Sequence, residues 1–530
     1  MIVSWSLSDA GIPMQTMNRP ALFSEHPALS RLCAHLARIA DVRAAAALLE
    51  WDQETYMPSG ATGVRAEQLS TLHRLAHEWF ISEETGVLLE AAAAAVSGWP
   101  PDDLAVRLVA VVREDYDRAR RLPPELVAAL ARTETEAREA WKQARQENNY
   151  MLFAPYLEQL LNLNREKAEA LGYEAHPYDA LLEQYEPGMT TADVQRLFEQ
   201  LRAHLVPLVQ ELGGQSQPAH AFLHRHVDAE RQWKLNRMLL EVVGFDLQRG
   251  RLDASVHPFS TGIAISDVRL TTRIDPHDFT SGLFATLHEA GHGLYEQGID
   301  PALERTPLAD GASLGLHESQ SRLWENLIGR SLPFWEYFFP HLQRLLEGVL
   351  DDVSLEAFYR AINRVQPSLI RVEADEVTYN LHILLRFELE LALLEDSLSV
   401  QDLPEAWNDR MQCYLGLRPV TFREGVLQDI HWSQGAFGYF PTYTLGNLMS
   451  AQLWEALEQE IADVAVYIRR GDFHPVLAWL RQQIHRYGRA WKAPVLLQQA
   501  TGNQLRVEPW LAYIRKKYQA LYPTASVSWS

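Results

Sequence analysis

Apolar residues recur every three or four positions along most of the chain. In segments 28–79 and 105–150, leucine and alanine follow this spacing while mixed charges occupy the opposite face. The same spacing continues over 156–171 and 191–212. This is the period of amphipathic α-helices, so the pattern predicts a mainly α fold built from long helices.

One short segment has the two-residue period of a β-strand instead. Between positions 265 and 274, Asp267 and Arg269 alternate with Val268 and Leu270, so one face of the segment is polar and the other mostly apolar. A charged strand face needs either an ion-pair partner or a cleft beside it. The sequence therefore predicts a small β-sheet in an otherwise helical protein.

The chain gives no internal sign of separate domains. Its 530 residues, of which 47% are hydrophobic, are enough to bury a large core. We find no repeat with a period of roughly 20–50 residues and no low-complexity tract. We therefore expect one helical unit over 26–530, either undivided or bilobed, after a loosely ordered extension at 1–25.

Charge and cysteine content exclude several classes of protein. The net charge of -21 would repel nucleic acid and anionic membranes. The chain contains no run of about 18 uncharged apolar residues, so the sequence predicts no membrane span. Residues 1–13 also lack the basic start of a secretion signal. We therefore expect a cytoplasmic protein. Cys33 and Cys413 are too few for a thiolate metal site, so any metal must be held by histidine and carboxylate.

The clearest chemical signal is the His-Glu-x-x-His sequence at 288–292. On a helix, His288 and His292 lie about 40° apart around the axis, so both imidazoles can bind one tetrahedral ion. Glu289 lies beside that face, where its carboxylate can take a proton from a water on the metal. Taken alone, the motif also fits a helix with two hydrogen-bonded histidines.

A catalytic zinc ion needs a third protein ligand from another segment. Glu318 is the candidate, because it lies 26 residues after His292, at the start of an apolar helical run, and so leaves room for one turn of the chain. The spacing alone equally allows a solvent-exposed glutamate on a helix. Zinc is the metal we expect, although cobalt and manganese accept the same ligands.

Six separated motifs occur in order along the chain. They are His-Pro-Phe at 257–259, Asp-x-Arg-x-Thr at 267–271, the histidine motif at 288–292, His-Glu-Ser-Gln at 317–320, Ile-Arg-x-x-Ala-Asp at 370–375 and Gly-x-x-Gln-Asp-x-His-Trp at 425–432. In these motifs the sequence resembles the carboxypeptidase Taq family of metallocarboxypeptidases. The similarity extends from about residue 51 through the C-terminal helices.

The resemblance implies a fold and a set of roles. It implies a mainly helical metallopeptidase with a deep active-site groove and a small sheet near the metal, usually a homodimer, that acts on peptides with a free C-terminus. It also implies that His288, His292 and Glu318 bind zinc and that Glu289 is the general base. These roles agree with those suggested by the residues themselves.

A carboxypeptidase must also recognise the free carboxylate of its substrate, and the fork of an arginine suits this task. Arg371 is our first candidate. If 371–386 is one helix, Arg371, Asp375, His382 and Arg386 share a polar stripe, and Asp375 could orient Arg371 or a metal-ligand histidine. An internal salt bridge is the alternative for Arg371. Arg269 on the predicted strand is the rival candidate, and a structural ion pair is an equally good explanation of this arginine.

The glycine-punctuated, aromatic segment 431–443 suits a loop beside a cleft. Peptide hydrolysis develops negative charge on the carbonyl oxygen, so a histidine or tyrosine donor is expected there. His431 and Tyr439 are the candidates. Each could equally be a buried ring whose polar tip has a structural partner.

Together these features predict a zinc metallocarboxypeptidase that removes C-terminal residues by attack of a zinc-activated hydroxide. A helical zinc endopeptidase or dipeptidyl carboxypeptidase is the nearest alternative, because the metal chemistry would be identical. A zinc-bound scaffold without activity is a further alternative, although the intact Glu289 argues against it.

Overall fold

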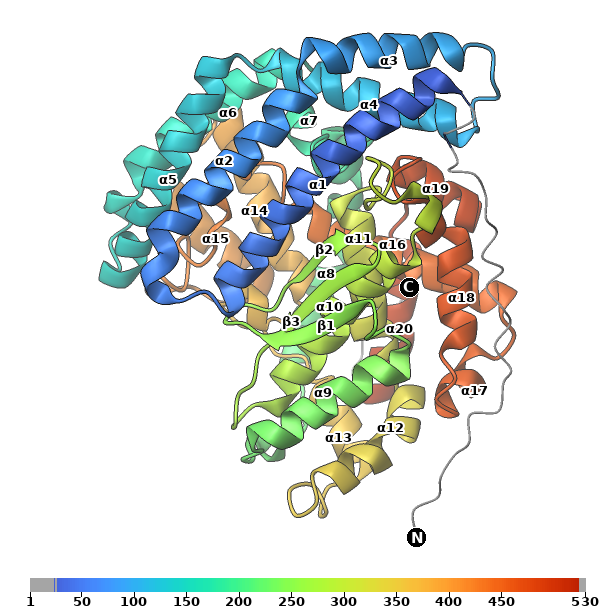
Figure 1. Cartoon of the computed structure of the whole chain (residues 1–530). Helices are drawn as coiled ribbons and strands as arrows, with labels where there is room; N and C mark the ends of the chain where they lie inside the picture. Colours follow the sequence, from blue (N-terminus) through green and yellow to red (C-terminus); the bar gives the residue numbers. More distant parts are fainter. Residues whose placement is uncertain (1–22, 24–25, 524–530) are drawn as a thin grey trace, which may run out of the picture.

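Helices make up most of the computed structural model, which describes Phe23 and residues 26–523. They surround one small sheet of three strands (Figure 1). The predicted mainly α fold with a small sheet is therefore confirmed. The predicted extension at 1–25 lies outside the described residues, except for Phe23. The single unit over 26–530 and the deep groove stay predictions.

The N-terminal helices are shorter than the apolar pattern predicted. The segment 28–79 divides into two helices at Pro58, and 105–150 divides into two at Pro123. Proline disfavours helical backbone in the residue before it, and Leu122 is accordingly extended. The helices of this half are α1 (Pro27–Thr55), α2 (Thr62–Phe80), α3 (Glu83–Ala95), α4 (Leu104–Arg121), α5 (Pro124–Glu147), α6 (Ala154–Leu171), α7 (Pro177–Leu182), α8 (Thr191–Gly213) and α9 (Ala229–Val243).

The sheet consists of β1 (Gly250–Ala254), β2 (Ser260–Ala264) and β3 (Asp267–Thr272) in the order β1-β3-β2. The central strand β3, which confirms the predicted strand, pairs parallel with β1 and antiparallel with β2. The helix α10 (Phe279–Gly298) packs against β3, where the Thr286 and Thr272 hydroxyls lie 2.9 Å apart. Helix α1 passes over β2 (Figure 1).

Three helices in the middle of the molecule pack closely enough to exclude side chains at particular positions. They are α10, α11 (Leu314–Arg322) and α16 (Pro441–Glu460). A Cβ on Gly291 of α10 would lie 2.5 Å from the carbonyl oxygen of Gln320, and one on Gly446 of α16 would lie 2.6 Å from the side chain of Glu318. Glycine at these two positions lets α11 lie directly between its neighbours.

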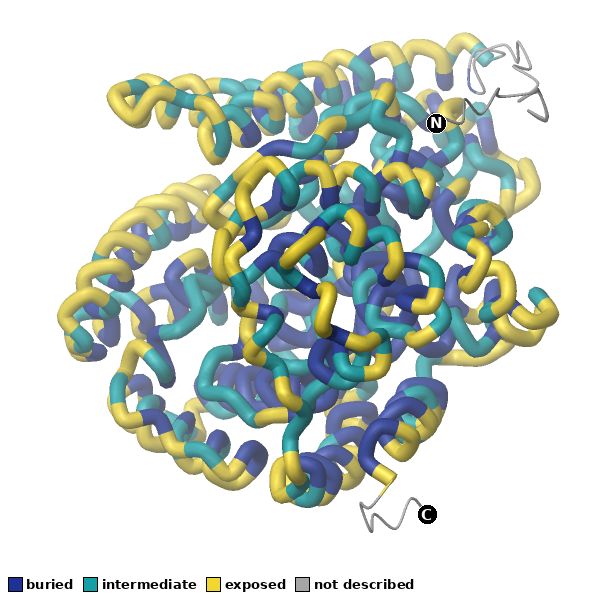
Figure 2. Tube along the Cα trace, turned by 90° about the horizontal axis from the view of Figure 1, so that it is seen from below, coloured by how far each residue is buried: buried dark blue, intermediate teal, exposed yellow. Residues whose placement is uncertain are grey.

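The remaining helices enclose this centre. They are α12 (Leu332–Leu345), α13 (Leu355–Ile362), α14 (Tyr379–Leu394), α15 (Leu403–Leu415), α17 (Val464–Arg469), α18 (His474–Gln483), α19 (Ala493–Thr501) and α20 (Glu508–Leu521). Figure 2 shows buried residues in the inner helices and exposed residues along the outer sides of the peripheral ones. One hydrophobic cluster runs through α5 to α20, and a second lies mainly among α1 to α4.

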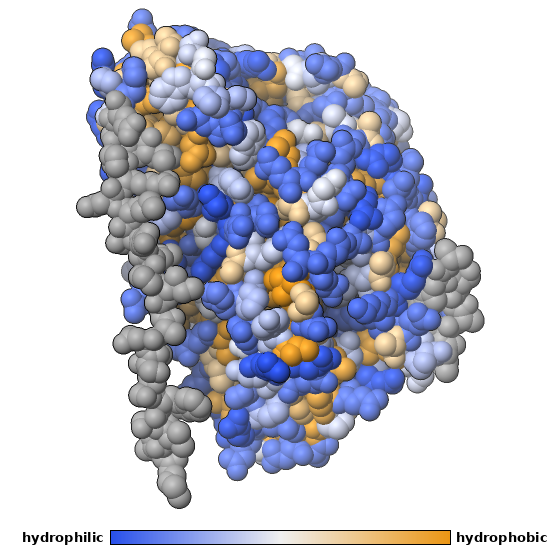
Figure 3. All heavy atoms as spheres, turned by 90° about the vertical axis from the view of Figure 1, so that its right-hand side faces the viewer, coloured by the Kyte–Doolittle hydropathy of each residue, from blue (hydrophilic) through white to orange (hydrophobic). Residues whose placement is uncertain are grey.

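Hydrophilic residues cover most of the face that carries α17 and α18, and apolar residues are scattered among them (Figure 3). Among the described residues, none of the helices combines the length and the apolar character that crossing a bilayer requires.

Candidate metal centre

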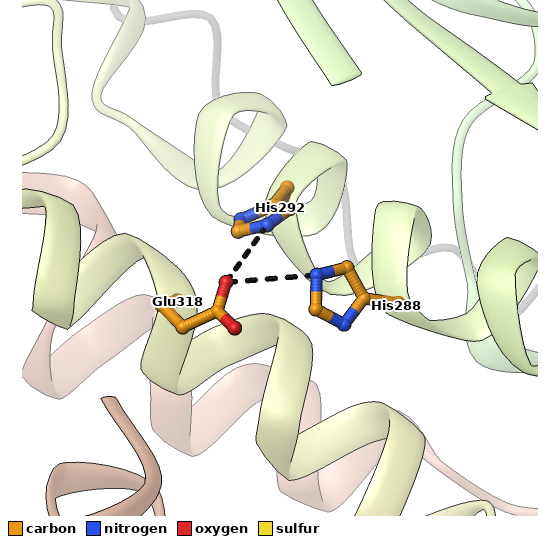
Figure 4. Close-up of side chains that lie close together, drawn as sticks. All are labelled: His288, His292 and Glu318. Atoms are coloured by element: carbon orange, nitrogen blue, oxygen red, sulfur yellow. Dashed lines mark ion pairs between the residues drawn. The ribbon is translucent and has the colours of Figure 1, made fainter. Parts of the chain in front are cut away.

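Two neighbouring helices bring the three predicted metal ligands together (Figure 4). His288 and His292 lie one turn apart on α10, and Glu318 lies on α11. Each helix has a hydrogen-bonded N-cap: Asp278 accepts from the Ser281 N–H on α10, and Ser313 accepts from the Leu316 N–H on α11. The short α11 therefore begins at a defined residue, one turn before Glu318.

The spacing of the three side chains fits a divalent cation. The Nε2 atoms of His288 and His292 each lie 3.5 Å from Oε2 of Glu318. Two ligands that each lie ~2.1 Å from a tetrahedral ion are about 3.4 Å apart, whereas a direct hydrogen bond would be shorter. The donor set of two imidazoles and one carboxylate also matches catalytic zinc sites. The predicted set therefore fits such an ion.

Two side chains that the sequence analysis did not single out hold these ligands in place. Glu325 accepts a hydrogen bond from Nδ1 of His288 at 2.9 Å, and Arg322 donates from Nε to Oε1 of Glu318 at 2.7 Å. The π-helical turn Leu323–Ile328 carries Glu325 back toward α10. Their spacing in the sequence could have indicated both, because residues four and seven positions after Glu318 lie on the same face of a helix as Glu318.

His292 has a comparable support on its other side. Its Nδ1 atom lies 2.6 Å from Nδ1 of His317, and the two rings stack with centroids 4.5 Å apart. Nε2 of His317 in turn lies 3.1 Å from Oε1 of Glu296. Both candidate histidine ligands are thus backed by a chain of polar groups that ends in a carboxylate.

Burial and neighbouring charges set the protonation of this cluster. Burial, with His317 nearby, lowers the pKa of His292 to about 3, which leaves a neutral imidazole able to bind a metal. Burial alone would raise the pKa of Glu318, but Arg322 and His288 hold it well below its usual range. Burial raises the pKa of Glu289 to about 7, which suits a general base at neutral pH.

The position of Arg371 differs from the prediction. Residues 371–373 form a separate turn of 3₁₀-helix, and α14 begins only at Tyr379, so the predicted helix over 371–386 is wrong. Asp375 contacts neither Arg371 nor a metal-ligand histidine through a hydrogen bond. It accepts hydrogen bonds from the N–H groups of Gln366 and of two residues just before α14, and so holds the turn that leads into that helix.

Arg371 is paired with Asp429 instead. Its Nε and Nη2 lie 2.9 and 2.8 Å from Oδ1 of Asp429, while Nε of Arg386 donates to Oδ2 at 2.7 Å. Burial would raise the pKa of Asp429, but the two arginines lower it well below its usual range. His382, predicted on the same polar stripe, is buried rather than exposed to a wet groove. We refer to Arg371, Arg386 and Asp429 as the Asp429 cluster.

His431 and Tyr439 lie beside this cluster. The His431 ring lies 5.2 Å from that of Tyr439, and its Nε2 is 3.0 Å from the Tyr443 hydroxyl. Burial, together with Arg371, lowers the pKa of His431 to about 3, so its imidazole is neutral. Burial and then the charge of Glu318 raise the pKa of Tyr439, which connects the loop electrostatically with the metal centre.

Arg269 is on β3 and has different partners. Its Nε and Nη2 donate to the two carboxylate oxygens of Asp267 at 2.9 Å each, and its guanidinium lies 4.4 Å from the ring centroid of Trp51 on α1. The structural ion pair weighed for this strand is present. This contact also joins α1 to the sheet.

Comparisons with known proteins cover nearly the whole chain. The sequence model of the family described as carboxypeptidase Taq (M32) metallopeptidase matches residues 31–518. Thermostable carboxypeptidase 1 of Thermus thermophilus is 45% identical over 90% of this chain and 95% of its own length, and carboxypeptidase 1 of Bacillus subtilis is 39% identical over 92% and 97%.

Solved structures give the same result. The crystal structure of the M32 carboxypeptidase of Deinococcus radiodurans superposes with a TM-score of 0.92 at 41% identity, over 94% of this chain and all of that one. A Pyrococcus furiosus carboxypeptidase structure gives 0.90 at 39% identity, with the same coverage. The match covers both the candidate metal ligands and the surrounding helices. The chain therefore belongs to the carboxypeptidase Taq family, a family of metal-dependent peptide hydrolases.

Proposed function

We propose that this metallocarboxypeptidase uses zinc and releases single residues from the C-terminus of peptides. One observation carries the proposal. The imidazoles of His288 and His292 and the carboxylate of Glu318 converge with the spacing of zinc ligands. The buried Glu289 follows His288 directly in the chain. His288, His292 and Glu318 would hold the ion. When bound, zinc would polarise the scissile carbonyl and make a water molecule more acidic.

Glu289 is the proposed general base. It accepts a proton from the attacking water and returns it to the nitrogen of the leaving amine. Its position next to His288 in the same turn of α10 and its raised pKa support this role. A carboxylate with a pKa of about 7 is a stronger base than an ordinary glutamate, and at neutral pH it can still give the proton up in the second step.

Arg371 is the proposed anchor for the substrate carboxylate. It lies beside His431 and the Tyr443 ring, and the charge of Glu318 contributes to the raised pKa of the Tyr443 hydroxyl, which supports a position near the metal centre. Three of its N–H groups already bind Asp429 and Tyr379, which fixes the orientation of the fork. Arg269 remains the rival, because its pairing with Asp267 also leaves donors free.

His431 and Tyr439 are proposed to stabilise the oxyanion of the reacting carbonyl. A neutral imidazole can donate one hydrogen bond, and the raised pKa of Tyr439 keeps its phenolic proton in place. A homodimer, as the resemblance implies, is part of the proposal and can be checked by light scattering on the purified protein.

A time course on a plain peptide, followed by mass spectrometry, tests the function. We expect the successive loss of single C-terminal residues and no loss when a chelator is present. A peptide with an amidated C-terminus serves as the matched control, because it lacks the carboxylate that the arginine would bind. Equal cleavage of the amidated peptide would favour an endopeptidase, and removal of residues in pairs would favour a dipeptidyl carboxypeptidase.

A further inference from the structure

The loop between Asp429 and Tyr439 is attached to one helix, α14, at two points. Arg386 of α14 binds Asp429, two residues before His431. Glu390, one turn later on α14, accepts hydrogen bonds from the indole N–H of Trp432 at 2.9 Å and from the backbone N–H of Gly438 at 3.2 Å. The two contacts of Glu390 thus lie on either side of the segment 433–437.

Side-chain anchors are needed here because the backbone of the loop is irregular. Both Gly435 and Gly438 have positive φ, of 63° and 89°. A Cβ on Gly438 would lie 2.8 Å from the backbone of Leu181, so the loop passes tightly against α7. After the short 3₁₀ turn His431–Gln434, no regular hydrogen-bond ladder holds the chain until α16 begins at Pro441. The position of the loop therefore depends on what binds it.

Glu390 is suited to this task by the direction of its hydrogen bonds. It is fully buried, and its third donor is the Tyr178 hydroxyl at 2.7 Å. Oε1 accepts from Trp432, and Oε2 accepts from both Gly438 and Tyr178. The two N–H groups cannot act as acceptors, so both oxygens must accept. A carboxylate satisfies this requirement, whereas an amide would place its own N–H₂ against one of the two donors.

We propose that Glu390 is a positioning residue of the hydrolytic reaction, which holds the loop so that His431 and Tyr439 stay beside the candidate metal centre. The inference rests on the function proposed above for these two side chains. Among the described residues, Glu390 forms hydrogen bonds with Tyr178, Trp432 and Gly438 and with none of the candidate metal ligands. It acts through the indole of Trp432 and the backbone of Gly438.

The main test is Glu390→Gln, assayed at pH 8. Burial raises the pKa of Glu390 to about 7, although the hydrogen bonds from Tyr178 and Trp432 act to lower it. The wild-type carboxyl is therefore mostly ionised at pH 8. We expect kcat to fall roughly ten- to a hundredfold, because small displacements of catalytic groups have effects of this size. The zinc content should stay unchanged, and KM should change much less than kcat.

Tyr178→Phe is the matched control. It removes a hydrogen bond from the same carboxylate but leaves both bonds to the loop. We expect a lower thermal midpoint and a wild-type kcat. If Glu390→Gln lowers the thermal midpoint with kcat unchanged, or if Tyr178→Phe lowers kcat equally, Glu390 has only a structural role and the inference is overturned.

A double-mutant cycle with Trp432→Phe adds a second, independent measurement. Without the indole N–H, the amide of Glu390→Gln can turn its oxygen to Gly438 and Tyr178, so the substitution should cost less kcat in this background than in the wild type. Equal costs would contradict the proposed contact. If Glu390→Gln yields no soluble protein, Trp432→Phe alone decides, since a wild-type kcat would show that this anchor is not needed.

His431→Ala and Tyr439→Phe separate this inference from the function on which it rests. If neither changes kcat, the proposed role of the loop in the reaction is wrong. If either one lowers kcat while Glu390→Gln does not, the loop takes part in the reaction but Glu390 does not position it.

Discussion

The candidate metal centre and the Asp429 cluster are both buried groups of charged and polar side chains, but they differ in how closely their charged atoms approach one another. In the Asp429 cluster each carboxylate oxygen accepts a hydrogen bond from an arginine at less than 3 Å. In the metal centre both imidazoles stop 3.5 Å from the same oxygen of Glu318. The first cluster is satisfied by the chain alone, whereas the second has the spacing of a group arranged around a cation.

The difference indicates that the two clusters have different roles, one in fixing the backbone and the other in binding a metal ion. A charge pair that is satisfied within the chain fixes the backbone segments that carry it, here the turn with Arg371, helix α14 with Arg386 and the loop with Asp429. In the metal centre, Arg322 compensates the charge of Glu318, but the two imidazoles are not hydrogen-bonded to that carboxylate, so a bound ion should add stability there. The metal centre should therefore respond to metal, and the Asp429 cluster should not.

Metal removal tests this contrast and has the largest expected effect. Dialysis against a chelator should abolish peptide hydrolysis and lower the thermal midpoint, because the ion binds the folded chain and not the unfolded one. Added zinc should restore both, and zinc-saturated chelator is the control. Full activity in protein shown by elemental analysis to lack metal would contradict the proposed site.

The Glu289→Gln substitution should have the next largest effect. Loss of the general base is expected to lower kcat by roughly 10²–10⁴-fold while zinc binding is retained, because the amide cannot accept the proton. Glu296→Gln on the same helix is the matched control when both variants are assayed at saturating zinc, because Glu296 supports His292 only through His317, and it should lose far less activity. Wild-type turnover in the Glu289 variant at full zinc content would exclude it as the base.

The two clusters also differ in how far sequence reasoning could predict them. His288, Glu289 and His292 lie within two turns of one helix, so their spacing alone predicts a shared face. Glu318 lies on a second helix, so its position near the histidines could not be predicted from helical spacing, and its role as a ligand came from the resemblance to the family motif at 317–320. The pairing of Arg371 with Asp429 joins segments 58 residues apart in sequence and depends on tertiary packing.

The errors have identifiable causes. Asp375 was expected to orient Arg371 because both were placed on one continuous helix, but the Asp375 side chain binds backbone N–H groups of the turn that precedes α14. The apolar period likewise ran through Pro58 and Pro123, where the chain turns. Helical periodicity identifies the buried face of a segment, but local side-chain-to-backbone hydrogen bonds and proline decide where the helix ends.

Glu325→Gln should sharpen the description of the metal centre. The carboxylate on Nδ1 of His288 orients the ring and raises its basicity, so its loss should weaken zinc binding roughly 10–100-fold, measured by competition with a chelator of known affinity. Glu296→Gln acts on His292 only through His317 and should weaken binding less. A larger effect at Glu296 would reverse the proposed ranking of the two supports.

The smallest expected effect distinguishes the two arginines, and lysine is the useful replacement because it keeps the charge and loses the fork. Arg371→Lys should raise KM for a free peptide about tenfold, the size of one lost charge-assisted hydrogen bond, with little change for an amidated peptide. Arg269→Lys should keep KM near the wild-type value, since the contacts of Arg269 among the described residues are with Asp267 and the Trp51 ring rather than with the residues around His431. The opposite result would assign carboxylate recognition to the sheet. The Asp429 cluster would then be a scaffold that positions the loop and takes no part in binding the substrate.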